Sequence, residues 1–401
     1  MSEELSRLAA SNHRRVIRSA HDRRSPGLFI PQMRILIVRL GSIGDIVHTL
    51  PSLAAIRRAL PDAEISWVVE RRSSEILLDN PLLDRLIEID TKALRRGLMS
   101  GETLRAPRQQ LRLLRASAFD LALDFQGLIK SAMIARLSGA RRIVGFAREQ
   151  LREPPSRILL HDSVSIPNGL HVIRKNLALV EGALKIPIPA GEAELEFPIA
   201  IDQVHEVEAD SAASGTGGRY AILNPGGGWP TKLWSAEKFG TLADELWNHF
   251  GLSSLVTSGP GEDELTRRAL SSSKSGKAKA VSVSLKGFTA LAKRAQVYVG
   301  GETGPTHLAI AMRTPVVGLL GPTEWWRNGS PYSDDVCVER TDIGCRENCH
   351  RRSCSQWICM DIEVERVLNA VEERLRRANA FLGNRLERAF VPELGTHKCV
   401  L

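Results

Sequence analysis

The sequence predicts an α/β protein built from two doubly wound domains, and three observations lead to this fold class. Apolar segments with the length of strands alternate with amphipathic helices from Met33 onward. This alternation stops around residues 187–213 and starts again at Tyr220. The chain has 401 residues, which exceeds the size of one ordinary hydrophobic core. Because alternating strands and helices form right-handed βαβ units, we expect a parallel sheet in each domain.

The first series of elements begins with the segment MRILIVRL at Met33. Residues 35–40 are apolar except for Arg39, which is typical of a strand buried on both faces. The pattern then predicts a helix over 46–60, strands over 64–69 and 119–124, and a helix over 128–137. Together these elements indicate an N-terminal domain over residues 33–190.

The second series follows residues 191–217, whose Pro, Ser and Gly content predicts an interdomain linker. We expect a C-terminal domain over residues 218–380, with strands over 220–225, 253–259, 280–283, 296–301 and 315–321 and helices over 236–250, 262–271, 289–295 and 306–312. We expect residues 381–401 to form a tail outside this domain. Ligands of open α/β sheets bind at the carboxyl ends of the strands, so we expect a binding cleft where these ends of the two sheets meet.

Composition limits the classes of function. The chain is 43% hydrophobic and 25% charged, which is typical of folded globular domains. Its net charge of +8 fits an anionic partner, but a generally Arg-rich surface explains it equally well. The basic residues are scattered and aromatic residues make up only 5%, so a nucleic-acid binder is disfavoured.

The expected location is the cytoplasm. No apolar run approaches the roughly 18–20 residues of a membrane span, and the basic N-terminus lacks the apolar segment of a signal peptide. Residues 1–32 are expected to form a loose, Arg-rich extension. The alternative is a basic helix that lies on acidic lipid headgroups, so any membrane contact is expected to be peripheral.

The loop Gly41-Ser42-Ile43-Gly44-Asp45 connects the first strand to the first helix. It lacks the third glycine of a dinucleotide fingerprint and the Gly-Lys-Ser/Thr of a P-loop, so a nicotinamide enzyme or an ATPase is poorly supported. Asp45 is either a carboxylate favoured by the helix dipole or a functional group at the cleft. His48 follows one turn later and is more typical of a histidine on a helix face than of a ligand.

Two loops of the second series are suited to binding phosphate. Gly226-Gly227-Gly228 follows a strand and is succeeded by Thr231 and Lys232, although a lysine in such a loop can also simply be exposed. In the segment GGETGPTH, Thr303 and Gly304 precede a helix, so their amides can face an anion. Asp263 and Glu264 are candidates for contacts with ribose hydroxyls or, alternatively, a solvated helix start. No loop after an apolar strand contains an Asp-x-Asp pair, which is the arrangement that would hold Mg²⁺ between substrate phosphates. No bound metal is therefore expected in this cleft.

Four cysteines cluster near the end of the second series, at Cys345, Cys349, Cys354 and Cys359. Their spacing is too irregular for a standard zinc knuckle, although four thiolates can still hold a structural Zn²⁺. A reduced, partly buried role is the favoured interpretation. The neighbouring His350, Arg351 and Arg352 either contact phosphate or are exposed.

Four segments resemble glycosyltransferase family 9, which contains the ADP-heptose:lipopolysaccharide heptosyltransferases. In chain order they are RLGSIGDIVHTLPSLAAIRRALPDAEISWVVE, DFQGLIKSAMIARLSGARRIVGF, GGGWPTKLW and VGGETGPTHLAIAMRTPVVGLLGPT. The resemblance covers roughly residues 33–380. It implies the GT-B arrangement, in which two Rossmann-like domains face each other across a cleft, with the acceptor on the N-terminal side and the sugar nucleotide mainly on the C-terminal side.

The resemblance also implies a reaction and its residues. An inverting transfer needs a base for the acceptor hydroxyl, and the family places this role on Asp45. The residues expected to bind the ADP-heptose donor are Thr231, Lys232, Asp263, Glu264, Glu302, Thr303, Gly304 and His307. The family usually has Asp where this chain has Glu302, which makes that contact less directly transferable. No cofactor is expected, since protein groups neutralise the diphosphate.

The acceptor implied by the resemblance is a Kdo sugar on phosphorylated lipid A, which carries a carboxylate. The residues expected to bind it are Gly44, Lys130, Arg152, His171 and Arg174. The Arg152-Glu153-Pro154 triplet and the WVVE strand resemble the first heptosyltransferase of the pathway more than the second. Two alternatives remain open: a family member with another sugar donor or acceptor, and a non-catalytic module that binds sugar nucleotides.

Overall fold

The computed structural model describes residues 32–91, 112, 114–346, 349 and 351–389. The expected extension over 1–32 lies outside the described residues except for Gln32, and His350 lies outside them as well. The described residues from Met33 onward form one compact unit.

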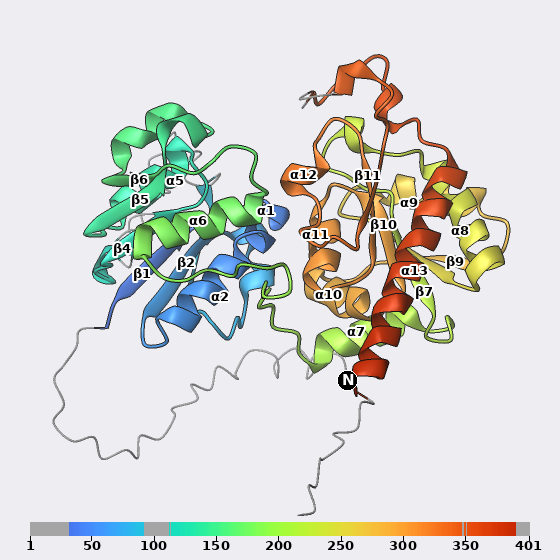
Figure 1. The fold of residues 1–401 in the computed structure, drawn as a ribbon, viewed down its shortest axis with the longest axis horizontal. Coiled ribbons are helices and arrows are strands. Elements are labelled where there is room, and N and C mark those ends of the chain that lie inside the picture. The colour runs from blue at the N-terminus through green and yellow to red at the C-terminus, as the bar shows by residue number, and fades with distance from the viewer. Residues whose placement is uncertain (1–31, 92–111, 113, 347–348, 350, 390–401) are drawn as a thin grey trace, which may run out of the picture. The chain divides into compact units, whose positions relative to one another are not determined.

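The first sheet contains six parallel strands in the order β3-β2-β1-β4-β5-β6 (Figure 1). Its strands are β1 (Arg34–Val38), β2 (Glu64–Glu70), β3 (Arg85–Ile89), β4 (Leu121–Asp124), β5 (Arg142–Phe146) and β6 (Asp162–Val164). The central strand β1 pairs Ile35 with Ile65 on one side and with Leu121 on the other. This position between two neighbours explains its continuous apolar sequence.

The second sheet repeats this strand order, with all six strands again parallel: β12-β11-β10-β7-β8-β9. Its strands are β7 (Tyr220–Asn224), β8 (Ser253–Thr257), β9 (Ala278–Val281), β10 (Val297–Gly301), β11 (Val316–Leu320) and β12 (Val336–Glu339). Both sheets are therefore doubly wound, as the sequence predicted, and each has a point between its first and fourth strands where the strand order reverses.

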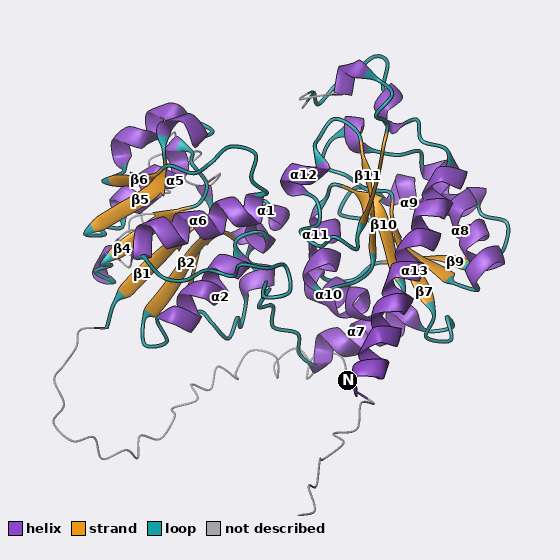
Figure 2. Ribbon diagram, in the orientation of Figure 1, coloured by secondary structure: helices purple, strands orange, loops and turns teal. Residues whose placement is uncertain are grey.

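Helices cover both faces of the sheets (Figure 2). In the first half they are α1 (Ile43–Val47), α2 (Leu50–Ala59), α5 (Ile129–Leu137) and α6 (Val172–Leu184). In the second half they are α7 (Gln203–Ala213), α8 (Ala236–Phe250), α9 (Asp263–Ser272), α10 (Leu285–Arg294), α11 (Gly304–Ala311), α12 (Trp325–Asn328) and α13 (Val364–Ala389). Short 3₁₀ turns lie at Arg71–Ser73, Glu75–Leu77, Arg148–Gln150, Pro154–Leu159, Pro230–Lys232, Gly344–Arg346 and Ile358–Met360.

Three predictions of local structure need correction. The single helix expected over 46–60 is two helices, α1 and α2, that meet at His48 and Thr49. Pro51 has no N–H to continue the hydrogen-bond ladder across this point. The expected linker over 191–217 contains α7, which begins where Asp202 accepts a hydrogen bond from the His205 amide and which buries Ala209. The second half also ends later than expected, because α13 runs to Ala389.

The apolar core is layered on the faces of the two sheets. Leu36 and Val38 of β1 pack with Ala132 and Ala135 of α5. The opposite face of β1 belongs to a larger cluster that also contains residues of α1, α2, α6, α10 and α11, so one apolar cluster includes parts of both halves. A third cluster lies between the second sheet and helices α8 and α13. This packing fixes the loops that leave the carboxyl ends of the central strands.

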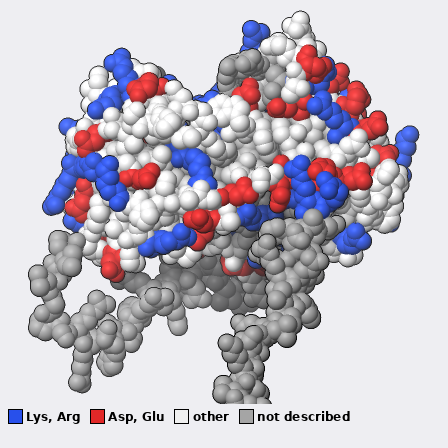
Figure 3. Space-filling model, viewed as in Figure 1, with Lys and Arg blue, Asp and Glu red and all other residues white. Residues whose placement is uncertain are grey.

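The surface carries charges of both signs. On the face shown in Figure 3, Lys and Arg side chains are interspersed with Asp and Glu, so the excess of positive charge does not gather there into one band. Among the residues that the structure describes, no helix is both long and apolar enough to cross a membrane.

Candidate active site

The loops at the two points of strand reversal line one cavity of about 460 Å³. The segment from the end of β1 through α1 to His48, and the loop after β4, contribute Arg39, Ser42, Gly44, Asp45, His48, Phe125 and Gln126. The loop after β7 and the segment from the end of β10 into α11 contribute Gly228, Trp229, Lys232, Glu302, Thr303, Gly304 and His307. The remaining lining residues are Phe146, Gln150, Arg152, Leu170, Val172, Lys175, Asn176, Thr323, Arg327 and Asn328. The cavity therefore lies at the position that the doubly wound fold predicts.

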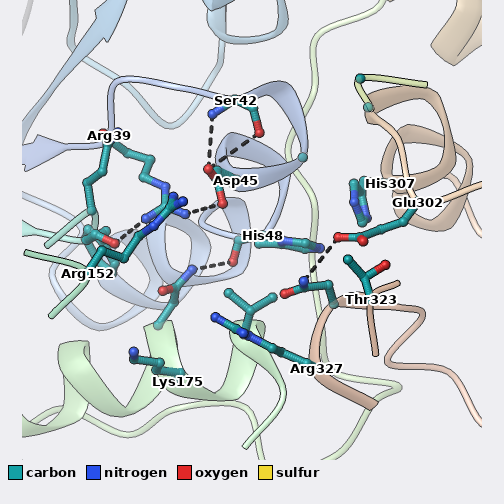
Figure 4. Close-up of a pocket in the computed structure, with 18 of the residues that line it drawn as sticks. Arg39, Ser42, Asp45, His48, Arg152, Lys175, Glu302, His307, Thr323 and Arg327 are labelled. Atoms are coloured by element: carbon teal, nitrogen blue, oxygen red, sulfur yellow. Dashed lines mark hydrogen bonds and ion pairs between the residues drawn. The ribbon is translucent and has the colours of Figure 1, made fainter. Parts of the chain in front are cut away.

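Asp45 lies at the start of α1 and is held at both carboxylate oxygens (Figure 4). Its Oδ1 is 2.5 Å from Nη2 of Arg39. Its Oδ2 accepts hydrogen bonds from the backbone amide of Ser42 at 3.1 Å and from the Ser42 hydroxyl at 3.4 Å. Arg39 is 6% exposed and also donates to the Phe125 carbonyl. Asp45 is thus a fixed carboxylate that remains 28% exposed and faces the cavity.

Lys232 and Glu302 form an ion pair on the wall supplied by the second sheet. Lys232 Nζ is 2.8 Å from Glu302 Oε2, and both side chains are 12% exposed. Glu302 Oε1 also accepts a hydrogen bond of 3.1 Å from Asn328. Burial opposes ionisation of Glu302, but the charge and hydrogen bond of Lys232 prevail and lower the pKa of this carboxyl. The wall thus presents an ammonium group whose charge is balanced by a neighbouring acid.

Three histidines meet beside the cavity. The ring of His48 lies 4.3 Å from that of His307 and 6.0 Å from that of His171, measured between centroids. Burial lowers the pKa of His307 to about 4, although the charges of Glu302 and Asp45 oppose this shift. Burial also lowers the pKa of His48, with further lowering from His307 and His171. The rings of His48 and His307 are therefore neutral at physiological pH, and they pack against each other where α1 and α11 meet.

The start of α11 faces the cavity through Thr303 and Gly304. Thr303 is the N-cap residue, so the first amides of α11 lie where they can bind an anion.

The glycine loop differs from the prediction. The amide of Gly227 donates to Glu262 at 2.8 Å, and the amide of Gly259 donates to the same carboxylate at 2.8 Å. The Gly227 amide, which we expected to bind phosphate, therefore already donates its hydrogen bond to Glu262.

Three residues expected to bind the donor are directed elsewhere. The Thr231 hydroxyl donates to the Arg351 carbonyl at 2.6 Å, so it braces the loop and does not line the cavity. Asp263 and Glu264 lie exposed in the first turn of α9, where Glu264 pairs with Arg267. The residue just before them, Glu262, makes the contacts to the glycine loop. The sequence indicated that an acid lies near the glycine-rich loop, but it did not show which of the three consecutive acids, Glu262, Asp263 or Glu264, makes the contact.

The residues expected to bind the acceptor divide in the same way. Gly44 and Arg152 line the cavity, whereas Lys130, His171 and Arg174 do not. Lys130 pairs with Glu70 at 3.0 Å, His171 contacts the Gly329 carbonyl at 3.0 Å, and Arg174 donates to the Pro189 carbonyl. Each of these three side chains contacts another part of the chain, and their role at the acceptor stays a prediction.

The cavity also contains cations that the sequence analysis did not single out. Arg39 holds Asp45, while Lys175 of α6 and Arg327 of α12 line the cavity beyond it. Lys175 lies one residue after Arg174 in the segment LHVIRKN. Because residues 174 and 175 are neighbours on a helix, only one of the two side chains can face the cavity, and the sequence did not indicate which one.

The four clustered cysteines line a second cavity of about 50 Å³, together with Thr231 and Arg351. All four are free thiols: Cys359 is buried, Cys349 is half-buried, and Cys345 and Cys354 are exposed. Within the described part of the chain, no group of three or more His, Cys, Asp or Glu side chains is arranged to hold a metal ion. The guanidinium of Arg352 lies 5.0 Å from the ring of Trp229, whose face is also 4.3 Å from the Lys232 ammonium. The cysteine segment therefore supports the loop that carries Lys232.

This geometry suits a transfer between two bound molecules. A fixed carboxylate on one wall faces an ammonium group and a helix start on the other. The carboxylate can accept a proton from a nucleophile, while the opposite wall can stabilise a phosphate leaving group.

Comparison with known proteins agrees with this geometry. The sequence pattern of glycosyltransferase family 9 (heptosyltransferase) matches residues 108–358. Lipopolysaccharide heptosyltransferase 1 of Pseudomonas aeruginosa is 29% identical over 325 residues, which cover 80% of this chain and 88% of the relative. Its namesake from Escherichia coli K12 is 27% identical over 300 residues, which cover 73% of this chain and 89% of the relative.

Solved structures show the same fold. The E. coli heptosyltransferase WaaC with ADP superposes with a TM-score of 0.66 and 22% identity, covering 87% of this chain and 100% of that chain. A family 9 glycosyltransferase from Veillonella parvula gives a TM-score of 0.69 with 21% identity, covering 86% and 97%. The architecture is GT-B, and the family match extends over more than half of the sequence. The chain therefore belongs to glycosyltransferase family 9, the heptosyltransferase family, and is a glycosyltransferase.

Proposed function

We propose that this enzyme transfers heptose with inversion from ADP-heptose to a Kdo sugar on lipid A during lipopolysaccharide biosynthesis. The observation that carries the proposal is the position of Asp45 and Lys232 on facing walls of one cavity in a member of this family. The relatives described above bear the name of the first lipopolysaccharide heptosyltransferase, which supports this donor and acceptor.

Asp45 acts as the general base in this proposal. A carboxylate offers about four lone-pair positions, and Arg39 and Ser42 together occupy three of them. The remaining position accepts the proton of the acceptor hydroxyl as its oxygen attacks the anomeric carbon. Arg39 fixes the carboxylate by holding one of its oxygens. Arg39 is thus a positioning residue.

The leaving group is ADP, which departs with the electron pair of the broken C–O bond. Its diphosphate gains negative charge, which Lys232 and the first amides of α11 stabilise. In this assignment the half with the first sheet binds the acceptor and the half with the second sheet binds the donor. Protein groups alone supply the positive charge at this leaving group.

The test is ADP release by the purified full chain with ADP-heptose and a Kdo-bearing lipid A acceptor. Asp45→Asn keeps the shape of the side chain but removes the base, so kcat is expected to fall about 10²- to 10⁴-fold. Asp62→Asn, at an exposed position after α2, is the matched control and is expected to retain activity. An Asp45→Asn enzyme with normal turnover would show that the base is assigned wrongly.

Two further arms separate the alternatives within the family. Replacing ADP-heptose with another ADP-sugar tests the donor, and an acceptor that already carries its first heptose tests the acceptor. Faster turnover with either substitute would assign the enzyme to a different step. Tight ADP binding without turnover of any pair would indicate a non-catalytic binding module.

We further propose that the enzyme meets its lipid-linked acceptor at the cytoplasmic face of the inner membrane. The net charge of +8 supports attraction to anionic headgroups. Sedimentation with phosphatidylglycerol vesicles should exceed sedimentation with phosphatidylcholine vesicles, and salt should reverse it. Equal binding to both vesicles would contradict this location.

For the clustered cysteines we propose a reduced structural role, supported by their free thiols and by the buried position of Cys359. The structural zinc considered from the sequence stays a prediction. Elemental analysis of the purified chain tests it, since one equivalent of zinc that is lost in Cys345→Ser would establish a metal site.

A further inference from the structure

Four thiols surround one small space beside the loop that carries Lys232. The residues that line this cavity of about 50 Å³ include Cys345, Cys349, Cys354, Cys359, Thr231, Pro322 and Arg351. Cys359 is buried, and burial raises the pKa of its thiol, with a further rise from the charges of the three other cysteines. Such an influence acts over short distances, so the four thiols are neighbours in space.

Cys354 has the environment of a reactive thiol. Its side chain is exposed, and its Sγ accepts a hydrogen bond of 3.4 Å from the Trp357 amide. The backbone hydrogen bonds of Trp357 and then Gln356 lower the pKa of this thiol, and the charge of Arg351 lowers it further. The thiolate is the form of cysteine that attacks an oxidant, so Cys354 is the cysteine of this cluster that an oxidant meets first.

The segment that contains Cys354 also holds the loop that carries Lys232. The Thr231 hydroxyl donates a hydrogen bond of 2.6 Å to the Arg351 carbonyl. The guanidinium of Arg352 lies 5.0 Å from the centre of the Trp229 ring, and the same ring lies 4.3 Å from the Lys232 ammonium. Because Thr231 directly precedes Lys232, a shift of residues 351–352 acts on the lysine through both contacts.

A second connection runs through the loop after β11. Pro322 lines the thiol cavity, and the next residue, Thr323, lines the active-site cavity. A hydrogen bond with Thr323 helps to lower the pKa of Glu302, the partner of Lys232. The thiol cavity is therefore connected to both members of this ion pair.

We propose that the four cysteines form an oxidation site, in which Cys354 forms a disulfide with another cysteine of the cluster and this bond weakens binding of the nucleotide donor. The proposal rests on the proposed function, in which Lys232 binds the diphosphate, and it adds regulation to that site. The form with four free thiols is then the active form.

The oxidant is a peroxide, and the reaction has two steps. The Cys354 thiolate attacks one oxygen of hydrogen peroxide, so that an S–O bond forms, the O–O bond breaks, and the released hydroxide takes a proton to become water. A second cysteine of the cluster then attacks the sulfur of this sulfenic acid as a thiolate. An S–S bond forms, and hydroxide leaves and takes the proton of the second thiol. Two thiols and one peroxide thus give one disulfide and two waters, and two electrons pass from sulfur to oxygen.

Formation of the disulfide must move the backbone beside Cys354. A disulfide requires the two Cα atoms to approach within about 4.4–6.8 Å in a defined orientation. Arg351 and Arg352 lie three and two residues before Cys354, so their contacts with the Lys232 loop are the first to be disturbed. Loss of one hydrogen bond together with one cation–π contact corresponds to about a 5- to 50-fold loss of donor affinity.

The experiment compares the reduced full-length chain with the same chain after treatment with hydrogen peroxide, which catalase removes before the assays. Oxidation should remove two of the six thiols that the denatured chain presents, and peptide mapping should place the disulfide between Cys354 and another cysteine of the cluster. The dissociation constant of ADP, measured by calorimetry, and the donor KM should rise about 5- to 50-fold, while the acceptor KM changes less than about twofold. Dithiothreitol should restore both values by thiol–disulfide exchange.

Variants separate the disulfide from general oxidative damage. Cys354→Ser should bind ADP like the reduced wild type and should keep that affinity after peroxide treatment. Cys337→Ser is the matched control, because it removes a half-buried thiol of β12 that is not among the residues lining the cavity, and it should remain sensitive to peroxide. Arg352→Met should weaken ADP binding before oxidation, and peroxide should then weaken it less than in wild type.

Several results would overturn the proposal. They are thiols that do not react, a disulfide that involves Cys337 or Cys399 or joins two chains, a disulfide within the cluster that leaves ADP affinity unchanged, and a Cys354→Ser chain as sensitive as wild type. The proposed function is tested separately by turnover of ADP-heptose in the reduced enzyme. A chain that loses ADP affinity on oxidation but never transfers heptose would support the oxidation site and contradict the transferase assignment.

Discussion

Gly44 of α1 lies against His307 of α11, and adding one methyl group at this position tests how strictly the site depends on the packing of these two helices. A Cβ built on Gly44 lies 2.3 Å from Cδ2 and 2.9 Å from Nε2 of His307. His307 is buried, and its ring is backed by that of His48 at a centroid distance of 4.3 Å. The imidazole therefore has little room to move, so Gly44→Ala must separate α1 from α11.

The magnitude follows from these distances. An ordinary Cβ contact begins at 3.4 Å, so α11 must shift by about 1 Å relative to α1. Overpacking of this kind costs about 1–3 kcal/mol, against a gain of about 1 kcal/mol because alanine favours the helix more than glycine does. The same shift moves Lys232 and Thr303 away from Asp45. A misplacement of about 1 Å can reduce turnover about 10²-fold.

The assays are kcat/KM for ADP release and urea unfolding. Gly344→Ala is the control, because a Cβ at Gly344 meets no atom within 4 Å. In a His307→Ala background, Gly44→Ala should no longer destabilise, since the ring that it strikes is absent. If Gly44→Ala retains wild-type kcat/KM and stability with His307 present, the two helices do not depend on this contact.

Three other predictions follow from the contacts in the cavity. In Arg39→Lys the single ammonium group cannot hold both Asp45 and the Phe125 carbonyl, so kcat should fall about tenfold while the donor KM is unchanged. A kcat equal to that of wild type in steady-state assays would show that Arg39 does not position Asp45. Lys232→Met should raise the donor KM about 10- to 100-fold and lower the free energy of unfolding by about 1–3 kcal/mol, because Glu302 stays buried without its cation; kinetics and urea unfolding test both effects. The pKa of His307 is lowered to about 4, so the unfolded chain binds the extra proton between pH 6.5 and about 4. Stability is therefore expected to fall as pH drops through this window, by on the order of 3 kcal/mol at most, and urea unfolding of His307→Gln should show a smaller pH dependence.

The fold was predictable because its signals are local and repeated. The run ILIV of β1 and the helix over 236–250 carry the periodicities of a buried strand and an amphipathic helix, and the structure has them nearly at the expected residues. The failures have local causes too. Pro51 divided one expected helix, and the cap at Asp202 starts α7 inside a segment whose composition indicated a linker.

The site was predictable where its residues follow strands. Asp45, Lys232 and Thr303 were found because the carboxyl end of a strand tells where a loop lies in the fold. Lys175 and Arg327 were missed because α6 and α12 are placed at the cavity by packing, which no spacing in the sequence records. Lys130 shows the same limit from the other side, since only the structure reveals that Glu70 is its partner.

Glu302 connects Lys232 with helix α12, and the length of its side chain permits this. One oxygen accepts from Lys232 and the other from Asn328, which directly follows Arg327 in α12. An aspartate, which the family resemblance leads one to expect here, is shorter by one methylene and cannot span the same two partners without a shift of the backbone. In the proposed mechanism the diphosphate competes with Glu302 for Lys232, while the other oxygen of Glu302 helps to hold α12 beside the cavity. The longer acid therefore links the charge around Lys232 to the position of α12.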